Sequence, residues 1–272
     1  PYFKKSENQE RGEDKFHNTG GPLSVSDQRI KLKLLDIFIE ATEEFGIPRT
    51  EDFNTGNNEG CGYFQVTENN GLRCSTAVGY LNPIKKRKNL KILTNAHVKN
   101  IEFENYKAVA VNYWKNGSII KVKSNNEIIL SAGSIGSPHI LQASGVGPNN
   151  LLKKNNIKVI KNHPLVGKNL YDHLMLRPVY TVKNIETLNE LYHSNYKKII
   201  AGLNFIFFRK GPLTMGASQL CGFTKSDAHL ETPNLQFHVA PMSTDMLGGG
   251  ALHKFPAFTP TICNLRPTSR GH

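Results

Sequence analysis

The sequence lacks several features that would point directly to a function. Its 272 residues contain no run of eighteen apolar residues, so no segment reads as a helix that spans a bilayer. Only four cysteines occur, and no two form a C-x-x-C pair, which argues against a zinc site or a thioredoxin-like redox centre. The nucleophile pattern G-x-S-x-G and the histidine spacings of metal sites are also absent, so we expect no metal.

The dinucleotide-binding pattern G-x-G-x-x-G is missing as well. Gly248-Gly249-Gly250 does not replace it, because neither a strand nor a helix is predicted around these glycines. The sequence starts at Pro1 without an initiator methionine or a signal peptide, and it stops at His272 without a closing element. We therefore expect an internal fragment, truncated at both ends.

Acidic residues are few compared with basic ones. The 22 Asp and Glu residues face 34 Lys and Arg residues, which gives a net charge of +12. The densest basic cluster, 85–88, is typical of a solvated loop. A non-catalytic basic domain that binds nucleic acid or an anionic surface is the alternative function. Interleaved aromatic residues and known nucleic-acid modules are missing, so no nucleic-acid partner is expected.

The composition is that of a globular protein, with 38% hydrophobic residues. Periodicity predicts a helix of about twenty residues after Ser26 and a second helix over 191–208. Asn116-Gly117 lies between two alternating segments and predicts a type I′ hairpin. Cys61 and Cys74 either pair across a hairpin or remain buried thiols. Strands are predicted at 63–66, 90–98, 108–114, 118–122, 127–131, 157–160, 219–224, 234–240 and 261–266, which gives a mixed α/β (α+β) fold.

The most informative stretch runs from Glu127 to Pro148. The apolar run 128–130 predicts a buried strand, and the small residues 131–133 predict a tight turn. Ser137-Pro138 then offers an N-cap with proline at the first helical position. A strand, a turn of small residues and a helix start bring backbone close to a cofactor in many α/β proteins.

This stretch resembles the second signature of the glucose-methanol-choline (GMC) flavoprotein oxidoreductases, which fixes small residues, a Ser-Pro and a Ser-Gly-x-Gly at set spacings. Other landmarks occur in the order of that family, and they cover nearly the whole chain. The pattern of these motifs most resembles the insect glucose-dehydrogenase-like branch of the family, and it also resembles choline dehydrogenases. The further landmarks are Gly71-Leu72-Arg73-Cys74-Ser75-Thr76-Ala77, Tyr80-Leu81, Arg87-Lys88-Asn89-Leu90, Val166-Gly167-Lys168-Asn169-Leu170-Tyr171-Asp172-His173, Gly211-Pro212-Leu213-Thr214 and Arg266-Pro267-Thr268-Ser269-Arg270-Gly271.

The resemblance implies a flavoprotein that oxidises the CH–OH group of an alcohol or sugar by hydride transfer to FAD. Reduced flavin then passes electrons to oxygen or another acceptor. Residues 1–84 correspond to the connecting helix and loops of the N-terminal region, 85–173 to part of the FAD-binding domain and 174–272 to part of the substrate-binding domain. Relatives of the insect type are often secreted.

The resemblance also marks candidate residues for FAD. Val98 matches the position whose backbone reads the adenine edge, although by its pattern alone it is an ordinary strand residue. Ala132 and Gly133 match the close approach to FAD, the alternative being a tight turn without a ligand. The catalytic histidine pair of the family has no match, so no catalytic residue is assigned and the chain alone is expected to be inactive.

Candidate substrate contacts lie on a predicted strand of the substrate-binding part. Gln236 and His238 share one strand face, so both could point at a substrate; His238 otherwise has a structural or surface role. Gln65 is a third and weaker candidate. In Asp172-His173 the two side chains point to opposite faces of an extended chain, which favours a structural role over a catalytic dyad.

Overall fold

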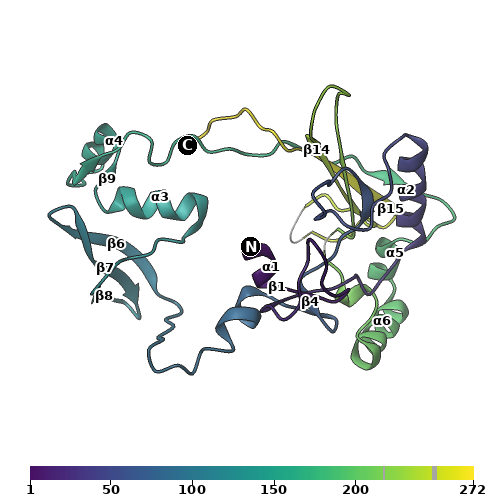
Figure 1. Ribbon diagram of the computed structural model, residues 1–272, viewed down its shortest axis with the longest axis horizontal. Coiled ribbons are helices and arrows are strands. Elements are labelled where there is room, and N and C mark those ends of the chain that lie inside the picture. The colour runs from purple at the N-terminus through teal and green to yellow at the C-terminus, as the bar shows by residue number, and fades with distance from the viewer. Residues whose placement is uncertain (217, 247–249) are drawn as a thin grey trace. The chain divides into compact units, whose positions relative to one another are not determined.

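The computed structural model describes residues 1–216, 218–246 and 250–272, and these form two compact units (Figure 1). The first unit combines Pro1–Leu90 with His173–Arg266, and the second combines Lys91–Asp172 with Pro267–His272. The segments expected at 1–84 and 174–272 thus contribute to one unit, and the second unit begins at Lys91 rather than at residue 85. The mixed α/β fold is confirmed.

A six-stranded antiparallel sheet forms the centre of the first unit. Its order is β11-β15-β14-β13-β3, with β12 also paired to β15. Residues from distant parts of the chain therefore meet in one sheet, since Gly222 of β13 pairs with Cys61 of β3 on one side and with Phe237 of β14 on the other. The strands are β3 (Gly60–Tyr63), β11 (Met175–Leu176), β12 (Tyr180–Thr181), β13 (Leu220–Thr224), β14 (Leu235–Ala240) and β15 (Ala257–Asn264).

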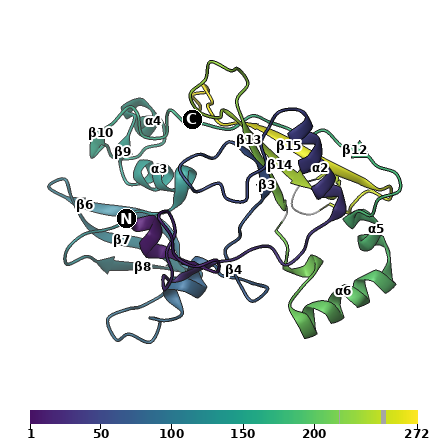
Figure 2. The same ribbon diagram turned by 45° about the vertical axis from the view of Figure 1, so that its right-hand side comes forward.

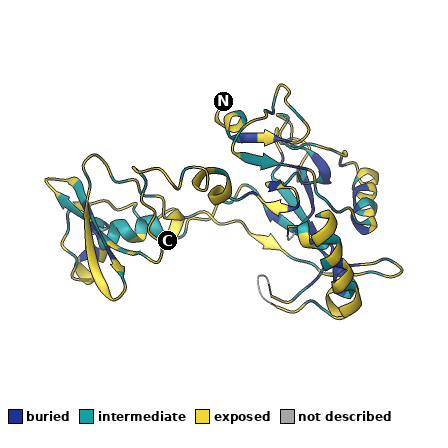
Figure 3. Ribbon diagram, turned by 90° about the horizontal axis from the view of Figure 1, so that it is seen from below, coloured by how far each residue is buried: buried dark blue, intermediate teal, exposed yellow. Residues whose placement is uncertain are grey.

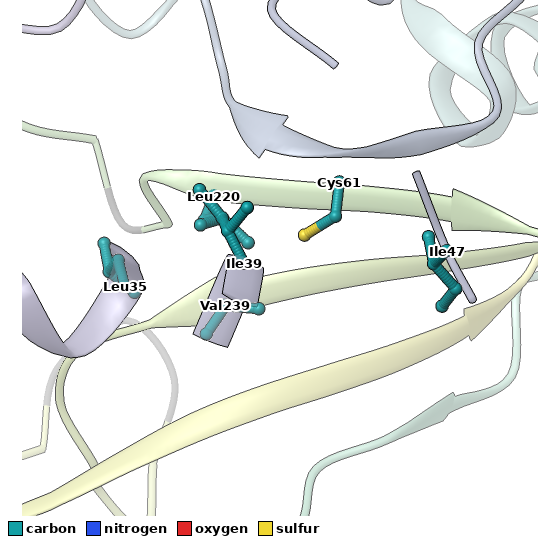
Figure 4. Packing of buried hydrophobic residues seen from close by; sticks show 6 residues of the cluster. All are labelled: Leu35, Ile39, Ile47, Cys61, Leu220 and Val239. Carbon is teal, nitrogen blue, oxygen red and sulfur yellow. The ribbon is translucent and has the colours of Figure 1, made fainter. Parts of the chain in front are cut away.

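Helix α2 (Lys33–Glu44) covers one face of this sheet (Figures 1 and 2). Leu35 and Ile39 are buried against Leu220 and Val239, which pair across β13 and β14 and so face the helix together (Figure 4). The predicted start of the helix at Ser26 is wrong. The N–H and C=O groups of Ser26 exchange hydrogen bonds of 2.9 Å with Val66, which holds the chain extended there.

The predicted helix 191–208 is interrupted at one residue. Helix α5 (Leu188–His193) begins with a capping box between Thr187 and Glu190, and α6 (Asn195–Phe208) follows after Ser194. The Ser194 backbone is extended, and its hydroxyl accepts a hydrogen bond from Lys197 N. The 3₁₀ helix η2 (Pro212–Thr214) comes next. Ser194 therefore ends one helix and caps the next.

The remaining short elements of the first unit surround the sheet. Strands β1 (Glu7–Gln9) and β2 (Leu23–Val25) pair in parallel, and β4 (Glu68–Asn69) pairs antiparallel with β5 (Leu72–Arg73). Helix α1 (Tyr2–Ser6) and the π-helix η1 (Ala77–Leu81) complete the set. Figure 3 shows that most buried residues of this unit lie on its strands and on α2.

The second unit contains a three-stranded antiparallel sheet of β6 (His97–Glu104), β7 (Lys107–Lys115) and β8 (Ser118–Lys123). The hairpin at Asn116-Gly117 is confirmed, with φ of 50° and 78° at the two turn residues. Helix α3 (Gly133–Ala143) lies beside β6. The shorter elements are β9 (Val146–Gly147), α4 (Asn149–Lys154) and β10 (Lys161–Asn162), with β9 and β10 parallel.

Three strand predictions in the second unit are wrong. Residues 127–131 form no strand, because no described strand pairs with this run, and Ile129 is 79% exposed. Residues 90–96 are irregular, and the strand begins only at His97, where β7 offers a partner. The apolar segment 157–160 also lies outside any strand, and β10 starts after it.

The disulfide alternative for Cys61 and Cys74 is wrong, and all four cysteines are buried free thiols. Cys61 lies in β3 within the core under α2. Cys74 instead directs its sulfur to the carbonyl oxygen of Pro22, at 3.8 Å. The two thiols are therefore held by different neighbours, as expected for buried cysteines that pack as small apolar residues.

Candidate functional site

A groove in the second unit brings together two of the residues predicted to bind FAD. Val98 on β6 and Ala132 before α3 both line a cavity of about 980 Å³, which lies between the sheet and the helix. They are 34 positions apart in the sequence, yet they line the same groove because α3 packs on β6. Gly136, His139, Ile140 and Ala143 of α3 form the helix side of the groove.

The backbone of Val98 lies on an edge strand. Among the described residues, β6 pairs with β7 only, so its other edge has no strand partner. The register shifts between Val98 and Asn100, so the regular pairing with β7 is interrupted at this point. Further along, the hydroxyl of Ser144 accepts a hydrogen bond of 2.7 Å from Ile101 N and occupies the edge there. The edge near Val98 therefore remains without a strand partner in the part of the chain that the structure describes.

An aromatic and basic patch borders the same groove, and sequence reasoning missed it. The Trp114 indole stacks on the His97 ring with centroids 5.9 Å apart, and Lys99 Nζ lies 5.5 Å from the Trp114 ring centroid. All three residues line the groove. The available signal was the pair of predicted strands 90–98 and 108–114, because the pairing of β6 with β7 places Trp114 opposite His97. A flat ring and a cation suit a planar heterocycle or an anionic group.

The turn before α3 departs from the predicted geometry. Ala132 is the N-cap residue, and the helix already begins at Gly133, so Pro138 lies inside it. The Ser137 hydroxyl accepts a hydrogen bond from Ala132 N at 3.0 Å instead of capping a later helix start. Gly133 has a φ of +80°, while a Cβ built on it would meet no atom within 4 Å. Glycine is therefore required by the backbone angle at this position, and Gly133 does not line the groove.

The candidate substrate contacts belong to the first unit. Gln236 and His238 alternate on β14 and occupy the face opposite the α2 core, together with Cys221. Gln236 Nε2 donates to Cys221 Sγ at 3.4 Å. The His238 ring lies 5.9 Å from the Phe64 ring. Both side chains thus have protein partners, which agrees with a structural role and leaves substrate contact a prediction.

Burial controls the protonation of two groups on this face. Desolvation lowers the pKa of His238 below its ordinary value of 6.5, so the imidazole is neutral at pH 7. Desolvation also raises the pKa of Cys221 to about 12, and the Gln236 hydrogen bond offsets only part of that effect. A neutral imidazole both donates and accepts hydrogen bonds, whereas this thiol is not a nucleophile near neutral pH.

Gln65 lines a separate cavity of the first unit. The cavity has a volume of about 480 Å³, and Phe64, Glu68, Thr214 and Met215 also line it. Gln65 pairs with Gln9 through two hydrogen bonds. Phe64 connects this cavity with the β14 face, because its ring also lies beside His238. Burial raises the pKa of Glu68 in spite of the nearby Arg29 guanidinium.

Asp172 and His173 do not act on each other. His173 Nδ1 lies 2.6 Å from Asn264 O, and Asp172 N donates to Ser269 Oγ at 3.3 Å. This agrees with the predicted structural role. Over the described ranges, no group of three His, Cys, Asp or Glu side chains is arranged to hold a metal ion. No helix in this part of the chain is both long and apolar enough to cross a bilayer.

Comparison with known proteins decides the family. The family model for GMC oxidoreductase matches residues 1–175. The chain belongs to the GMC oxidoreductase family. It is 37% identical over 274 residues to the oxygen-dependent choline dehydrogenase of Pectobacterium atrosepticum, covering 100% of this chain and 48% of that protein. It is 36% identical over 272 residues to alcohol dehydrogenase [acceptor] of Pseudomonas putida, covering 99% of this chain and 49% of that protein.

Solved structures of low sequence identity share the fold of this GMC chain. An FAD-dependent oxidoreductase from Chaetomium thermophilum superimposes with a TM-score of 0.84 at 20% identity, covering 99% of this chain and 55% of that one. Pyridoxine 4-oxidase from Mesorbium loti gives 0.82 at 23% identity, covering 99% and 49%. The chain therefore spans about half the length of the curated relatives and solved structures that it matches.

Proposed function

We propose that this chain supplies part of the FAD site and part of the substrate site of an alcohol-oxidising GMC flavoprotein. One observation carries the FAD assignment: Val98 and Ala132, which the family motifs mark independently, line the same groove. FAD, when bound, supplies the acceptor for a hydride from a CH–OH group. The chain's own part is to bind and orient the adenine end of this cofactor and the alcohol.

The residues present fit the adenine end of FAD. The groove of about 980 Å³ is in the size range of small-molecule sites. Among the described residues, the free edge of β6 at Val98 has no strand partner, and its backbone groups suit the polar edge of a heterocycle. Ala132 and Gly136 contribute small residues to the helix side of the groove, beside His139 and Ile140, and Trp114 offers a flat apolar surface.

The proposed substrate is an alcohol or a sugar. Two of the relatives bear the names choline dehydrogenase and alcohol dehydrogenase, which supports a CH–OH donor. Gln65, Gln236 and His238 are the proposed contacts, and each carries an uncharged polar group suited to a hydroxyl. Membership of the glucose-dehydrogenase-like subgroup and secretion remain predictions. Membership of the GMC family favours alcohol oxidation over the alternative function of a basic domain that binds nucleic acid.

Trp114 provides a direct test of the FAD site, because it is the single tryptophan of the chain and it lines the groove. Titration with FAD, and separately with ADP, is expected to quench its fluorescence in a saturable manner. Ala132→Leu should weaken binding at least tenfold by filling the groove. Ala228→Leu, at an exposed position of the first unit, is the matched control and should bind like the unchanged chain.

Two outcomes would overturn the assignment. One is the absence of saturable quenching by FAD and by ADP in a chain whose far-ultraviolet circular dichroism is that of a folded protein. The other is an Ala132→Leu variant that binds as tightly as the Ala228→Leu control.

A further inference from the structure

A histidine outside the motifs quoted above is buried between two carboxylates of the first unit. His17 is 2% exposed. Its Nδ1 lies 2.9 Å from Glu7 Oε2, and its Nε2 lies 2.8 Å from Asp52 Oδ2. A carboxylate beside each ring nitrogen favours the positively charged imidazolium through the attraction of opposite charges, and Nδ1 is also within hydrogen-bond distance of Glu7. The ring is further enclosed by Phe3, whose centroid is 5.9 Å away.

The hydrogen bonds continue from this ion cluster to Gln65. Gln9 is buried, and its Nε2 donates to Glu7 Oε1 at 3.2 Å and to Gln65 Oε1 at 3.3 Å. In return, Gln65 Nε2 donates to Gln9 Oε1 at 3.2 Å. Arg11 N also donates to Gln9 Oε1, at 3.4 Å. The carboxylate on one side and the N–H on the other leave a single favourable orientation for the Gln9 amide.

The orientation of Gln9 in turn fixes that of Gln65. The carbonyl oxygen and the NH2 group of the Gln65 amide face the complementary groups of Gln9, and Gln65 Nε2 also donates to Asp27 Oδ1 at 3.5 Å. Both N–H groups of Gln65 are therefore directed at protein acceptors. Its carbonyl oxygen receives one hydrogen bond and retains a second acceptor position. Such an acceptor, on a residue that lines the 480 Å³ cavity, suits a ligand that donates an O–H.

We propose that His17 is a positioning residue: through Glu7 and Gln9 it holds the Gln65 amide so that the carbonyl oxygen accepts a hydroxyl group bound in this cavity. The proposal rests on the proposed function, since it takes Gln65 as a contact of an alcohol or sugar. It adds a specific role for three buried residues that lie outside the cavity lining, and it predicts that the contact depends on the charge of the imidazole.

Loss of the His17 proton would disturb the network in a defined way. A neutral ring has one unprotonated nitrogen, which then faces a carboxylate without a proton between them. Gln9 Nε2 lies 3.4 Å from His17 Nδ1, so an unprotonated Nδ1 competes with Gln65 Oε1 for the Gln9 donor. The other charged groups at the cluster are Asp14, whose carboxylate accepts from His17 N at 2.6 Å, and Lys4, which donates to Asp14 O.

The balance of charges favours the protonated ring. Burial lowers the pKa of His17, but the hydrogen bond to Glu7 and the charges of Asp52, Glu7 and Asp14 outweigh it, and the pKa is raised above 6.5. At the far end of the network, Asp27 is held by an ion pair with Arg11 at 2.8 Å. The amide pair thus lies between two charged clusters of known composition.

The chain offers a direct spectroscopic test. It contains six glutamines, so labelling with ¹⁵N-glutamine gives a side-chain amide spectrum simple enough to assign with single substitutions. The Gln9 and Gln65 amide signals are expected to move with the midpoint of the His17 titration, followed in parallel with ¹³C-labelled histidine. Gln142 belongs to the second unit, where its Nε2 donates to Val166 O, and it should not follow that midpoint.

Two variants separate positioning from general stability. Glu7→Gln keeps the size of the side chain but removes its charge, and it should lower the pKa of His17 by about one to three units and shift the Gln65 signal. Glu13→Gln changes an exposed carboxylate of the same loop and should leave both unchanged. A Gln65 signal that stays constant through the His17 titration of the unchanged chain would overturn the proposal, as would a Glu7→Gln variant that leaves both signals in place.

The measurement uses neither flavin nor substrate. The FAD test concerns a groove in the other unit, so a failure there leaves this result interpretable, and the reverse also holds. Because the titration is read in the unchanged chain, it remains decisive even where Glu7→Gln fails to fold.

Discussion

Replacing Leu35 with alanine tests whether the core between α2 and the sheet holds the first unit together. Leu35 is 0% exposed and belongs to the cluster with Ile39, Leu220 and Val239. The change removes three buried carbon atoms, which costs about 2.4 kcal/mol at about 0.8 kcal/mol each. The space left behind adds a cavity penalty. We expect the free energy of unfolding to fall by about 3 kcal/mol.

The assay follows from where the cysteines lie. All four are buried, and all belong to the first unit, so their labelling by a thiol reagent at increasing urea reports the opening of that unit. With a urea slope of about 2 kcal/mol per molar, the labelling midpoint should fall by about 1.5 M. Trp114 fluorescence, recorded in the same samples, gives a separate measure of the second unit.

Ile37→Ala provides the control on the same helix. Ile37 is 44% exposed, and alanine is the better helix former, so the midpoint should change by less than half as much. Equal midpoints for Leu35→Ala and the unchanged chain would refute the packing argument. A loss as large in Ile37→Ala would show that the effect comes from the helix itself and not from its buried face.

Three further predictions concern other parts of the chain. Gly71→Ala should lower the free energy of unfolding by more than about 1 kcal/mol, because φ is +75° and the new Cβ would lie 2.7 Å from the carbonyl oxygen of Arg209. Gly202→Ala, which has open space on α6, should raise that free energy by up to about 1 kcal/mol, and thermal unfolding of the two variants distinguishes these effects. Because the pKa of His17 is raised in the folded state, the stabilising effect of its charge is complete below pH of about 6.5 and is lost as the pH rises through the folded-state pKa. The difference in urea midpoint between the unchanged chain and His17→Asn should therefore shrink from pH 6 to pH 9. A difference that stays constant over that range would contradict this prediction. Ser144→Ala leaves the buried Ile101 N–H without its acceptor and should cost about 1–3 kcal/mol, measured by Trp114 fluorescence in urea; an unchanged midpoint would mean that another acceptor takes over.

Local signals in the sequence predict those elements whose partners are also local. The Asn116-Gly117 hairpin forms as expected because its two strands are neighbours and its turn needs only the positive φ angles that these residues tolerate. The start of α2 was misplaced because Ser26 is an equally good strand residue when Val66 offers its backbone. Ser194 was missed for a related reason: an apolar pattern hides a cap residue that ends one helix and begins another.

The run 128–130 shows the limit most clearly. Its apolar residues predict a buried strand, but burial depends on the neighbours of a segment and not on the segment alone. No described segment pairs with it, and Ile129 stays exposed. Val98 and Ala132 nevertheless line one groove. Their positions depend on the packing of α3 on β6, and both of these elements are present in the chain. The candidate FAD groove was therefore predictable from motifs even though the strand assigned beside it was not.

The Gln65 network could not have been predicted from the sequence, and the reason is physical. Its members, residues 7, 9, 17, 52 and 65, follow no helical or strand period, and each is a common polar residue in a loop or a short strand. They form one network because two carboxylates from different segments contact the same imidazole inside the fold. A buried charge cluster of this kind is costly unless every member is paired, and the pairing here extends by hydrogen bonds to a candidate substrate contact. Substitutions within this network should therefore shift the side-chain amide signal of Gln65 more than substitutions at equally buried apolar positions. The ¹⁵N-glutamine spectra measure this difference directly.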